Sequence, residues 1–322
     1  MNLPWICALC IAACAGVSWT ANAQTFPVRP MHLIVPFPPG GIDTVARLLA
    51  VHMTEALGQP MVVENRAGAN GMIGSEIVAR AAPDGHTLLF ATSSTLVSGV
   101  MMMKKPPIDT LRDFTPVSIT YAGMQLIAVH SSVPVSTLQE LVEYAKRNPG
   151  KLNYSTSGVG SVFHFYAEAI KEAAGVEMVH VPYKGTGPSL QALVNGEVQV
   201  GFPSMQAIRP YVQKGTHRLL AVIVDKRLPQ APELPTVKEV LPAFEKPASW
   251  IGVFAPAALP PSVLTRLSSE FAKASHTPKV RAYMESGGNE LIASTHAEAL
   301  ATVKKDLAQT ARAMKVAGIQ PE

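Results

Sequence analysis

Hydroxyl and glycine residues gather in three loops of this chain, and such loops can bind an anion through backbone N–H groups and side-chain O–H groups. The first loop contains Gly40 and Gly41, the second is residues 92–95 (Thr-Ser-Ser-Thr), and the third is residues 155–161 (Ser-Thr-Ser-Gly-Val-Gly-Ser). A glycine turn between a strand and a helix leaves the first N–H groups of the helix unpaired, and α/β folds bind anions there. The pattern therefore predicts a binding site for a small anion.

The first loop does not match a known phosphate-binding motif. No Gly-x-x-x-x-Gly-Lys-Ser/Thr sequence follows Gly40-Gly41, and the pair does not fit the dinucleotide-binding pattern. A turn that serves only close packing of strand and helix is therefore the alternative interpretation. Asp43 would repel a bound carboxylate, so we expect it to cap the helix N–H groups unless the ligand carries an ammonium group. Ser93 and Ser94 could likewise be an N-cap instead of ligand contacts.

The sequence contains none of the catalytic motifs that would indicate an enzyme. Gly-x-Ser-x-Gly and His-Glu-x-x-His are both missing, and the nine histidines show no metal-ligand spacing. His164 and His180 are interpreted as hydrogen-bonded structural residues. We therefore predict binding without chemistry, with no catalytic residue, metal or cofactor. An α/β enzyme that acts on small acids is the alternative.

The charged residues give only a weak indication that the ligand is an anion. Lys184 is the one charged side chain in the glycine-rich turn of residues 183–188. Most lysines are solvated, but a lysine that faces a cleft could meet a carboxylate. The whole chain has a modest net charge of +4, with Lys and Arg scattered along it. Such a surface suits anionic small molecules and does not indicate nucleic-acid binding.

The three loops follow strands in an alternating pattern of strands and helices. Residues 33–35 form a short apolar run that is typical of a strand covered on both faces. Apolar residues in 45–57 recur at helical spacing, with Asp43 or Thr44 as the predicted N-cap and Gly58 as the stop. Further strands are expected at residues 61–63, 86–91, 117–119, 125–130, 152–156, 178–182, 198–203, 219–224 and 250–255, and further helices at 71–82, 137–147, 162–174, 190–194, 263–275 and 297–317.

The first 23 residues have the pattern of a signal peptide. They contain no Lys, Arg, Asp or Glu, carry an apolar run from Ile6 to Val17, and end in Ala21-Asn22-Ala23. The run is too short to span a membrane. We therefore predict an exported chain that is cut after Ala23, with lipidation of Cys14 as the alternative. All three cysteines lie in this segment, so the mature chain would contain none.

The length and the order of elements favour two domains. Cleavage after Ala23 leaves 299 of the 322 residues, which is above the usual size of a single core. The strand at 125–130 begins a second unit, and the strand at 250–255 returns to the first after a proline-rich run. We predict two lobes, each a mostly parallel sheet flanked by helices, with residues 24–121 and 247–322 in lobe 1 and residues 122–246 in lobe 2.

An ordered set of short motifs runs through the predicted mature chain. It includes LIVPFPPGG at residues 33–41, VVENRAGANGMIG at 62–74, APDGHTLLF at 82–90, NPGKLNYSTSGVGS at 148–161 and HVPYKGTGPSLQAL at 180–193. In this order the motifs resemble the tripartite tricarboxylate transporter receptor family, also called Bordetella uptake gene proteins. The resemblance implies a periplasmic-binding-protein-like fold whose two lobes close on a small carboxylate. It also implies a periplasmic location and delivery of the ligand to inner-membrane transporter subunits.

The same resemblance implies which residues contact the ligand. In the family, the ligand lies between the loop after the first strand and the Ser/Gly loop of the second lobe, held largely by N–H and O–H groups. A sensor that passes its ligand-bound shape to a membrane kinase is the alternative to transport, and we expect a monomer. The predicted ligand-binding residues are Phe37, Pro39, Gly40, Gly41, Asp43, Thr44, Ser93, Ser94, Thr156, Ser157, Gly158, Gly160, Ser161, Tyr183, Lys184 and Phe202.

Two departures from the family pattern bear on the ligand. Only Ile42 separates Gly41 from Asp43, whereas family members commonly carry two residues there. Pro203 follows Phe202 at a position where many members have an acidic or small residue. If that position recognises an amino group, the ligand of this chain would be an acid without one.

Overall fold

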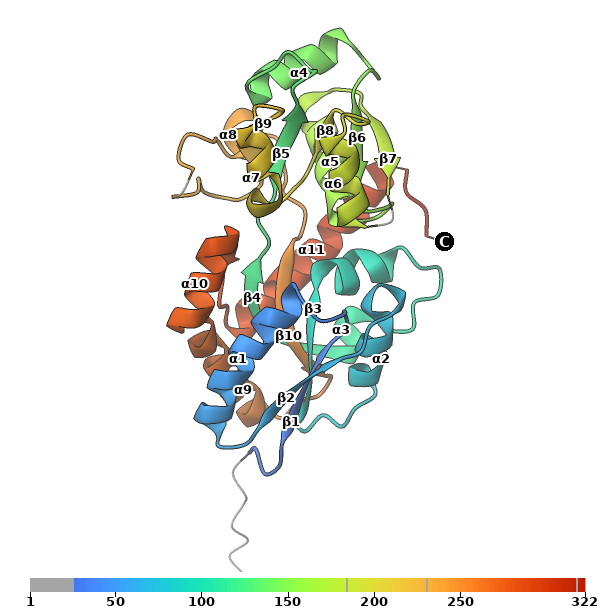
Figure 1. Ribbon diagram of the computed structural model, residues 1–322. Coiled ribbons are helices and arrows are strands. Elements are labelled where there is room, and N and C mark those ends of the chain that lie inside the picture. The colour runs from blue at the N-terminus through green and yellow to red at the C-terminus, as the bar shows by residue number, and fades with distance from the viewer. Residues whose placement is uncertain (1–25, 184, 230, 317, 322) are drawn as a thin grey trace, which may run out of the picture.

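The computed structural model describes residues 26–183, 185–229, 231–316 and 318–321. Its strands form two separate sheets, each flanked by helices, and the two lobes lie one above the other in Figure 1. The predicted two-lobed α/β fold is thereby confirmed. The signal peptide predicted for residues 1–23, with Cys14, lies outside the described residues.

The sheet of the first lobe is covered by helices on both faces. Neighbouring residues of β1 enter different cores, because Leu33 and Val35 pack on one face of the sheet and Ile34 packs on the other. This explains the apolar run without alternation in the sequence. In the order β11-β4-β10-β3-β1-β2, the strands are β1 (Met31–Val35), β2 (Met61–Asn65), β3 (Thr87–Thr92), β4 (Phe114–Ala122), β10 (Trp250–Pro256) and β11 (Glu290–Leu291).

The sheet of the second lobe repeats this construction. In β5, Ile127 and Val129 pack in one core and Leu126 and Ala128 pack in another. In the order β7-β6-β8-β5-β9, the strands are β5 (Leu126–His130), β6 (Asn153–Thr156), β7 (Val179–Pro182), β8 (Val200–Gly201) and β9 (His217–Val222).

Both sheets are mixed, whereas the sequence pattern predicts mostly parallel ones. The parallel part of the first sheet is β2-β1-β3 and that of the second is β7-β6-β8. The remaining neighbours pair antiparallel. The reason is that β5 and β10 enter their lobes from the passages between the lobes and so run opposite to the strands of the βα units. β4 runs in the same direction as β3, but its neighbours β10 and β11 both run the opposite way.

The helices cover the faces of the sheets, and a helix begins where each site loop ends. Besides the helices of six residues or fewer, two helices are missing from the sequence-based prediction, namely α7 (Met205–Gln213) and α10 (Pro278–Gly287), in which few residues are buried. The first lobe contains α1 (Ile42–Leu57), η1 (Ala69–Gly71), α2 (Met72–Ala79), the π-helix η2 (Ser94–Gly99), α3 (Thr110–Asp113), α9 (Pro261–Ser275), α10 (Pro278–Gly287) and α11 (His296–Val316). The second contains α4 (Leu138–Arg147), α5 (Val162–Ala174), α6 (Thr186–Val194), α7 (Met205–Gln213) and α8 (Val237–Val240). Of the helices in the described part of the chain, none has the length and apolar character needed to cross a membrane.

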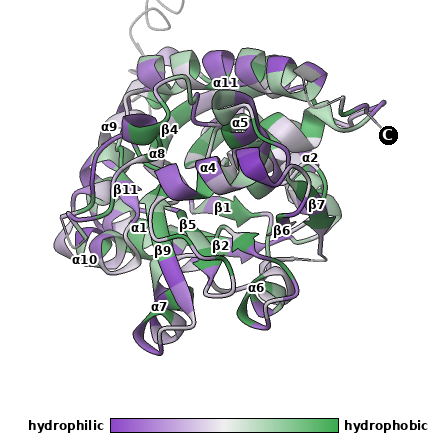
Figure 2. Cartoon of the chain, turned by 90° about the horizontal axis from the view of Figure 1, so that it is seen from above, coloured by the Kyte–Doolittle hydropathy of each residue, from purple (hydrophilic) through white to green (hydrophobic). Residues whose placement is uncertain are grey.

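The chain passes between the lobes at two adjacent places. The first passage follows β4 and the second precedes β10, and the Gly123 N–H donates a hydrogen bond to the Ser249 carbonyl at 3.1 Å, which joins them. Helix α11 runs along one side of the molecule and reaches α5 of the second lobe (Figure 2). These connections hold the two lobes on opposite sides of the space between their sheets.

Trp250 is anchored to α11 by a buried hydrogen bond, and this contact gives a first testable prediction. Its indole N–H donates to Asp306 at 2.6 Å. Burial raises the pKa of the Asp306 carboxyl, and the bond from Trp250 offsets this only in part. Because an amide removes the buried charge and keeps an acceptor, Asp306→Asn should preserve or raise stability at pH 7. Asp306→Ala should lower the free energy of unfolding by about 2 kcal/mol, since it leaves the indole N–H unpaired.

Urea denaturation of the two Asp306 variants beside the parent chain measures this difference. Equal losses in both variants would show that the ionised carboxylate itself stabilises the fold.

Candidate ligand-binding site

A cavity of about 830 Å³ lies between the two lobes. Its walls come from the ends of β1 and β3, from η2 and the residues after it, from the loop between β6 and α5, and from the passages between the lobes. This volume lies in the range of small-molecule sites. The cavity therefore stands where the carboxyl ends of the parallel strands of both sheets face each other.

The second-lobe wall is the loop from Ser157 to Ser161, which leads into α5. Ser161 is the N-cap of this helix, and its hydroxyl accepts the His164 N–H at 3.4 Å. The first N–H groups of a helix have no partner within the helix, so those of Val162 and Phe163 are available at the cavity wall. The positive end of the helix dipole adds to this preference for an anion.

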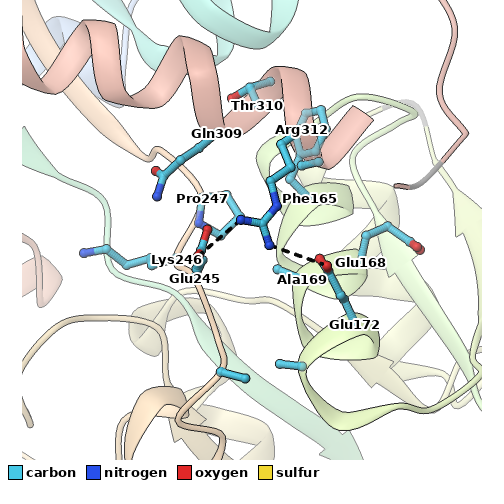
Figure 3. A pocket seen from close by; sticks show the side chains of 13 residues that line it. Phe165, Glu168, Ala169, Glu172, Glu245, Lys246, Pro247, Gln309, Thr310 and Arg312 are labelled. Carbon is cyan, nitrogen blue, oxygen red and sulfur yellow. Dashed lines mark ion pairs between the residues drawn. The ribbon is translucent and has the colours of Figure 1, made fainter. Parts of the chain in front are cut away.

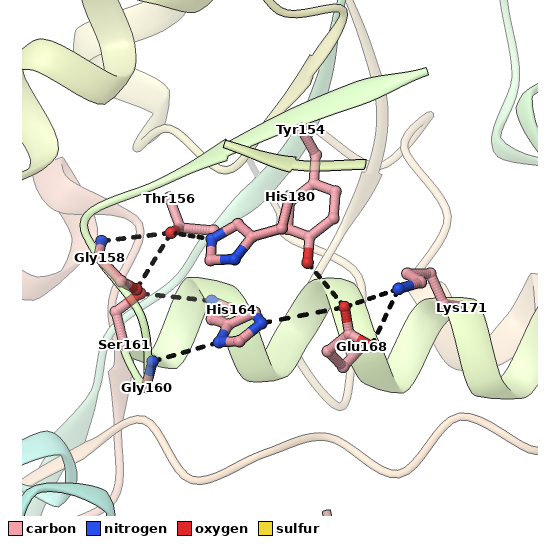
Figure 4. Close-up of polar contacts among 9 residues, drawn as sticks. All are labelled: Tyr154, Thr156, Gly158, Gly160, Ser161, His164, Glu168, Lys171 and His180. Atoms are coloured by element: carbon pink, nitrogen blue, oxygen red, sulfur yellow. Dashed lines mark hydrogen bonds and ion pairs between the residues drawn. The ribbon is translucent and has the colours of Figure 1, made fainter. Parts of the chain in front are cut away.

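The loop is held from behind by side chains that do not line the cavity (Figure 4). The Thr156 hydroxyl donates to the Gly158 carbonyl at 3.1 Å and lies 2.7 Å from His180 Nε2. The Gly160 N–H donates to His164 Nδ1 at 3.2 Å. The rings of His164 and His180 are stacked with centroids 4.0 Å apart. This arrangement fixes which N–H groups of the loop are used internally and which remain for a ligand.

A carboxylate continues the same network along α5. Glu168 accepts the Tyr154 hydroxyl at 2.7 Å and the Lys171 ammonium at 2.9 and 3.0 Å, and its Oε1 lies 4.0 Å from His164 Nε2. Burial raises the pKa of Glu168, but the hydrogen bonds from Lys171 and Tyr154 outweigh it and hold the pKa below the usual value. Glu168 is therefore ionised at neutral pH and anchors β6 to α5.

The protonation of this network gives a second prediction, namely that acid destabilises the fold between about pH 6.5 and 4. Burial and then the neighbouring His164 lower the pKa of His180 to about 4, with Glu168 opposing and Lys171 adding to the shift. The unfolded chain binds the proton near pH 6.5, so within this window it holds more protons than the folded chain, and stability falls as pH falls. We expect a loss of about 1–2 kcal/mol after allowance for partial solvent exposure.

Chemical denaturation at several pH values checks this slope. His180→Gln should flatten it, whereas the same change at His276, exposed on the other lobe, should leave it unaltered. A slope that is the same in His180→Gln and in the parent chain would contradict the prediction.

The first-lobe loop is shaped by a polar cluster behind it. The Asn65 amide donates to the Phe37 carbonyl at 3.0 Å and to Asp43 at 2.9 Å, and Arg47 donates to Asp43 at 3.0 Å. Burial raises the pKa of Asp43, but the bonds from Arg47 and Asn65 hold it below the usual value. Asp43 or Thr44 as N-cap is therefore wrong. The helix begins at Ile42 with Gly41 as N-cap, and the Asp43 side chain turns to Asn65 and Arg47 instead.

A strained turn forms the next part of this wall. Ala69 and Asn70 have φ of 47° and 52°, in the left-handed region that non-glycine residues seldom adopt. Gly68 and Gly71 flank them, also with positive φ. Asn70 lines the cavity. Strain of this kind persists only where the surroundings impose it, and it is common at ligand sites.

The floor of the cavity comes from the passages between the lobes. The Ser93 hydroxyl donates to the Ala248 carbonyl at 3.0 Å and so ties β3 to the second passage.

Tyr166 is fully buried at the cavity, and its hydroxyl has no hydrogen-bond partner among the described residues, although Ser249 lies close by. A buried hydroxyl without a partner is costly, so a ligand atom or a water is expected to meet it.

The structure brings together some of the predicted site residues. Those that line the cavity are Phe37, Ser93, Ser94, Ser157, Gly158, Gly160 and Ser161. Asp43 and Thr156 lie behind the lining and hold its loops, and the Tyr183 N–H supports the second-lobe loop by donating to the Thr156 carbonyl. Phe202 lines a separate cavity of about 240 Å³ in the second lobe. Pro39, Gly40, Gly41 and Thr44 are not among the lining residues, and Lys184 lies outside the described residues. Ligand contact by any of these residues stays a prediction.

Sequence reasoning missed most of the apolar lining. Met72, Met102, Met103 and Trp250 line the cavity together with Gln125. The Gly-Ala-Asn-Gly turn after the second strand could have been predicted to lie at the site. The ends of parallel strands share one edge of the sheet, so this turn lies at the same edge as Phe37 and Ser93. Met102 and Trp250 carried no such signal, because long-range packing brings them to the cavity.

A second cleft, between α5 and α11, has a different character (Figure 3). Of its charged residues, Glu172 and Glu245 pair with Arg312, whereas Glu168 and Lys246 pair with residues outside the lining. Arg312 lies 3.9 Å from Glu172 and 3.6 Å from Glu245, and all three side chains are about half exposed or more. Exposed pairs of this kind contribute little energy. This cleft joins α11 to the second lobe, and among the described residues that line it no buried side-chain group lacks a hydrogen-bond partner.

Comparison with known proteins places these features in a family. The sequence profile described as "Tripartite tricarboxylate transporter family receptor" matches residues 45–319. A UPF0065 protein from the tcbD-tcbE intergenic region of Pseudomonas sp. (strain P51) is 39% identical over 260 residues, which are 80% of this chain and 77% of that one. Protein BugT of Bordetella pertussis is 34% identical over 286 residues, which are 88% and 87% of the two chains.

Solved structures agree with this assignment. Rpa4515 of R. palustris, whose structure is described as "with adipate", is 33% identical with a TM-score of 0.77, and the match covers 92% of this chain and 100% of that one. MatC from Rhodopseudomonas palustris, described as having bound malate, is 31% identical with a TM-score of 0.71, covering 90% and 99%. The chain therefore belongs to the tripartite tricarboxylate transporter receptor family.

Proposed function

We propose that this chain is a periplasmic receptor that captures a small carboxylate between its two lobes and delivers it to inner-membrane transporter subunits. The observation that carries the proposal is the cavity at the N-terminus of α5, where the N–H groups of Val162 and Phe163 and the hydroxyls of Ser157 and Ser161 meet the first lobe. The adipate and malate in the structures of two relatives support the same ligand class.

The proposed lobes are residues 24–121 with 247–322 and residues 122–246. The two sheets support these limits, because β4 and β10 pair in one sheet and β5 and β9 in the other. In a receptor of this kind the ligand is bound by N–H and O–H groups, with no bond made or broken. We propose, accordingly, that the chain has no catalytic activity.

The test is a binding screen of the mature chain, refolded to remove any ligand carried through purification. Trp5 and Trp19 precede Ala23, so Trp250 is the only tryptophan of a chain cut there, and it lines the cavity. Binding of a carboxylate should change its fluorescence. At 100 times the dissociation constant, a ligand should also add about 2.7 kcal/mol to the free energy of unfolding.

Two outcomes would overturn the proposal. The first is that no carboxylate of any size shifts either signal. The second is that the refolded chain converts a bound acid into a product, which would favour an enzyme that acts on small acids. If the chain formed a ligand-dependent complex with a membrane kinase instead of a transporter subunit, the proposed binding site would stand and only the proposed partner would be replaced.

A further inference from the structure

We infer that Lys246 joins the two lobes behind the passages, on the side away from the ligand cavity, and that this contact opposes closure of the lobes on a ligand. The effect on affinity rests on the proposed function, whereas the effect on the position of the lobes does not.

Lys246 lies in the second passage and pairs with one carboxylate from each lobe. Its ammonium donates to Asp225 at 2.9 Å and lies 3.7 Å from Glu290. Asp225 follows β9 of the second lobe, and Glu290 begins β11 of the first, beside Ala122 at the end of β4. The Lys246 side chain is 21% exposed, less than either carboxylate, and it extends away from Arg312 in Figure 3. We call Asp225, Lys246 and Glu290 the rear bridge.

Both sheets place the ligand loops on one side of the passages and the rear bridge on the other. In the first sheet, β1 and β3 lie beyond β10, whereas β11 lies beyond β4. In the second sheet, β6 lies on one side of β5 and β9 lies on the other. Figure 1 shows the same division, with α8 and α10 at one side of the molecule and α2 and β7 at the other. A rotation about the passages that brings the ligand loops together therefore moves Asp225 away from Glu290.

The space around the rear bridge leaves room for this movement. The three residues of the bridge line a cavity of about 350 Å³. A further cavity of about 410 Å³ lies between residues 224–229 of the second lobe and residues 281–291 of the first. Because the lobes are not packed against each other across these cavities, their separation here exposes little additional apolar surface. The ion pairs of Lys246 are therefore contacts that a closing rotation weakens, and the longer pair, with Glu290, is the first to be lost.

A contact that closure weakens lowers the apparent affinity for a ligand. A ligand that binds the closed lobes must supply the free energy to weaken the rear bridge, and the apparent affinity falls with the fraction of chains in the binding-competent form. The two carboxylates are 64% and 41% exposed, so their pairing with Lys246 is weak and is screened by salt. The rear bridge should therefore change the affinity by a few fold without abolishing binding.

The first experiment is calorimetry on the refolded mature chain with adipate and malate as probes. Lys246→Met removes the ammonium and keeps an unbranched side chain, and we expect it to bind the probes about two- to fivefold more tightly than the parent chain. Glu290→Gln, which leaves the pair with Asp225 in place, should shift the affinity in the same direction. The gain in Lys246→Met should shrink between about 0.1 and 1 M KCl, because salt screens the bridge of the parent chain.

Lys273→Met is the matched control. Lys273 pairs with Glu270 at 2.8 Å within α9 of the first lobe, so its loss leaves the contact between the lobes unchanged. This variant should bind the probes as the parent chain does. Equal or weaker binding by Lys246→Met, or an equal gain in Lys273→Met, would overturn the inference and leave the proposed function intact.

The second experiment measures the movement of the lobes with spin labels. A chain cut after Ala23 contains no cysteine, so Arg227→Cys with Glu285→Cys places one label on each lobe, at exposed positions that line the cavity of about 410 Å³. Pulsed electron paramagnetic resonance should show a longer distance between the labels when adipate saturates the chain. Without any ligand, the distance should already be longer in Lys246→Met than in the parent chain. An unchanged or shorter distance in Lys246→Met would overturn the inference, even if no carboxylate bound and the proposed function had failed.

Discussion

Gly160→Ala should weaken ligand binding by about 10- to 100-fold. Gly160 has φ of 71°, where a side chain costs about 1–2 kcal/mol. A Cβ at this position would also lie 2.9 Å from Cε and 3.0 Å from Cγ and Sδ of Met102, which belongs to the other lobe. The new methyl group would therefore both distort the anion loop and push the lobes apart.

Gly150→Ala is the matched control for the backbone effect. Gly150 has φ of 69°, and an added Cβ there would meet no atom within 4 Å. This variant should lose stability by a similar backbone cost and keep its ligand affinity. Equal affinity losses in the two variants would show that the effect is a general loss of stability.

A double variant separates the two causes. Met102→Ala removes the side chain that the new methyl group would strike, so Gly160→Ala with Met102→Ala should recover part of the affinity relative to the effect of each single change. The coupling energy from this double-mutant cycle measures the contact between the lobes. Independent effects of the two changes would contradict closure of the lobes at Gly160. Titration of Trp250 fluorescence with the best ligand of the screen measures the affinity of the parent chain, the two single variants and the double variant.

The sequence was sufficient for the parts of the fold that depend on local pattern. The run at residues 33–35 predicted a strand buried on both faces, and in β1 alternate residues do enter two cores. Glycine turns and hydroxyl runs marked the edge where Phe37, Ser94 and Ser157 now line one cavity. These predictions succeed because the carboxyl ends of parallel strands meet at one edge of a sheet.

The sequence was insufficient where distant segments meet. Met102 reaches Gly160 only because the two lobes face each other, and nothing in the residues around Met102 indicates that contact. The N-cap of α1 was also misplaced, because Asn65, on the neighbouring strand β2, draws the Asp43 side chain away from the helix N–H groups. Competition of this kind between a local cap and a tertiary partner is visible only in the folded chain.

Glu168→Leu should lower the free energy of unfolding by about 3–5 kcal/mol, the typical cost of removing one member of a buried charged pair. The change leaves the Lys171 ammonium and the buried Tyr154 hydroxyl without the acceptor they share. Glu168→Gln should lose less, because its amide oxygen can still accept the Tyr154 hydroxyl. Urea denaturation at pH 7 measures both.

Glu172→Leu makes the same chemical change one turn later on α5 and serves as the control. Glu172 is half exposed, and its ion pair with Arg312 spans 3.9 Å between exposed side chains, so it should contribute about 0–1 kcal/mol. Similar losses in the two leucine variants would contradict a special role for Glu168.

The pH dependence separates the charge of Glu168 from its packing. Because the pKa of Glu168 is lower in the folded chain than in the unfolded chain, its contribution is complete above the unfolded pKa of about 4.3 and is lost as pH falls through the folded pKa. The parent chain should therefore lose stability in two stages, first through the histidine pair between about pH 6.5 and 4 and then through Glu168 below that window. In Glu168→Leu the second stage should shrink, because its carboxylate is gone. If both stages persisted unchanged, the acid sensitivity would come from other carboxylates, and Glu168 would stabilise α5 by packing alone.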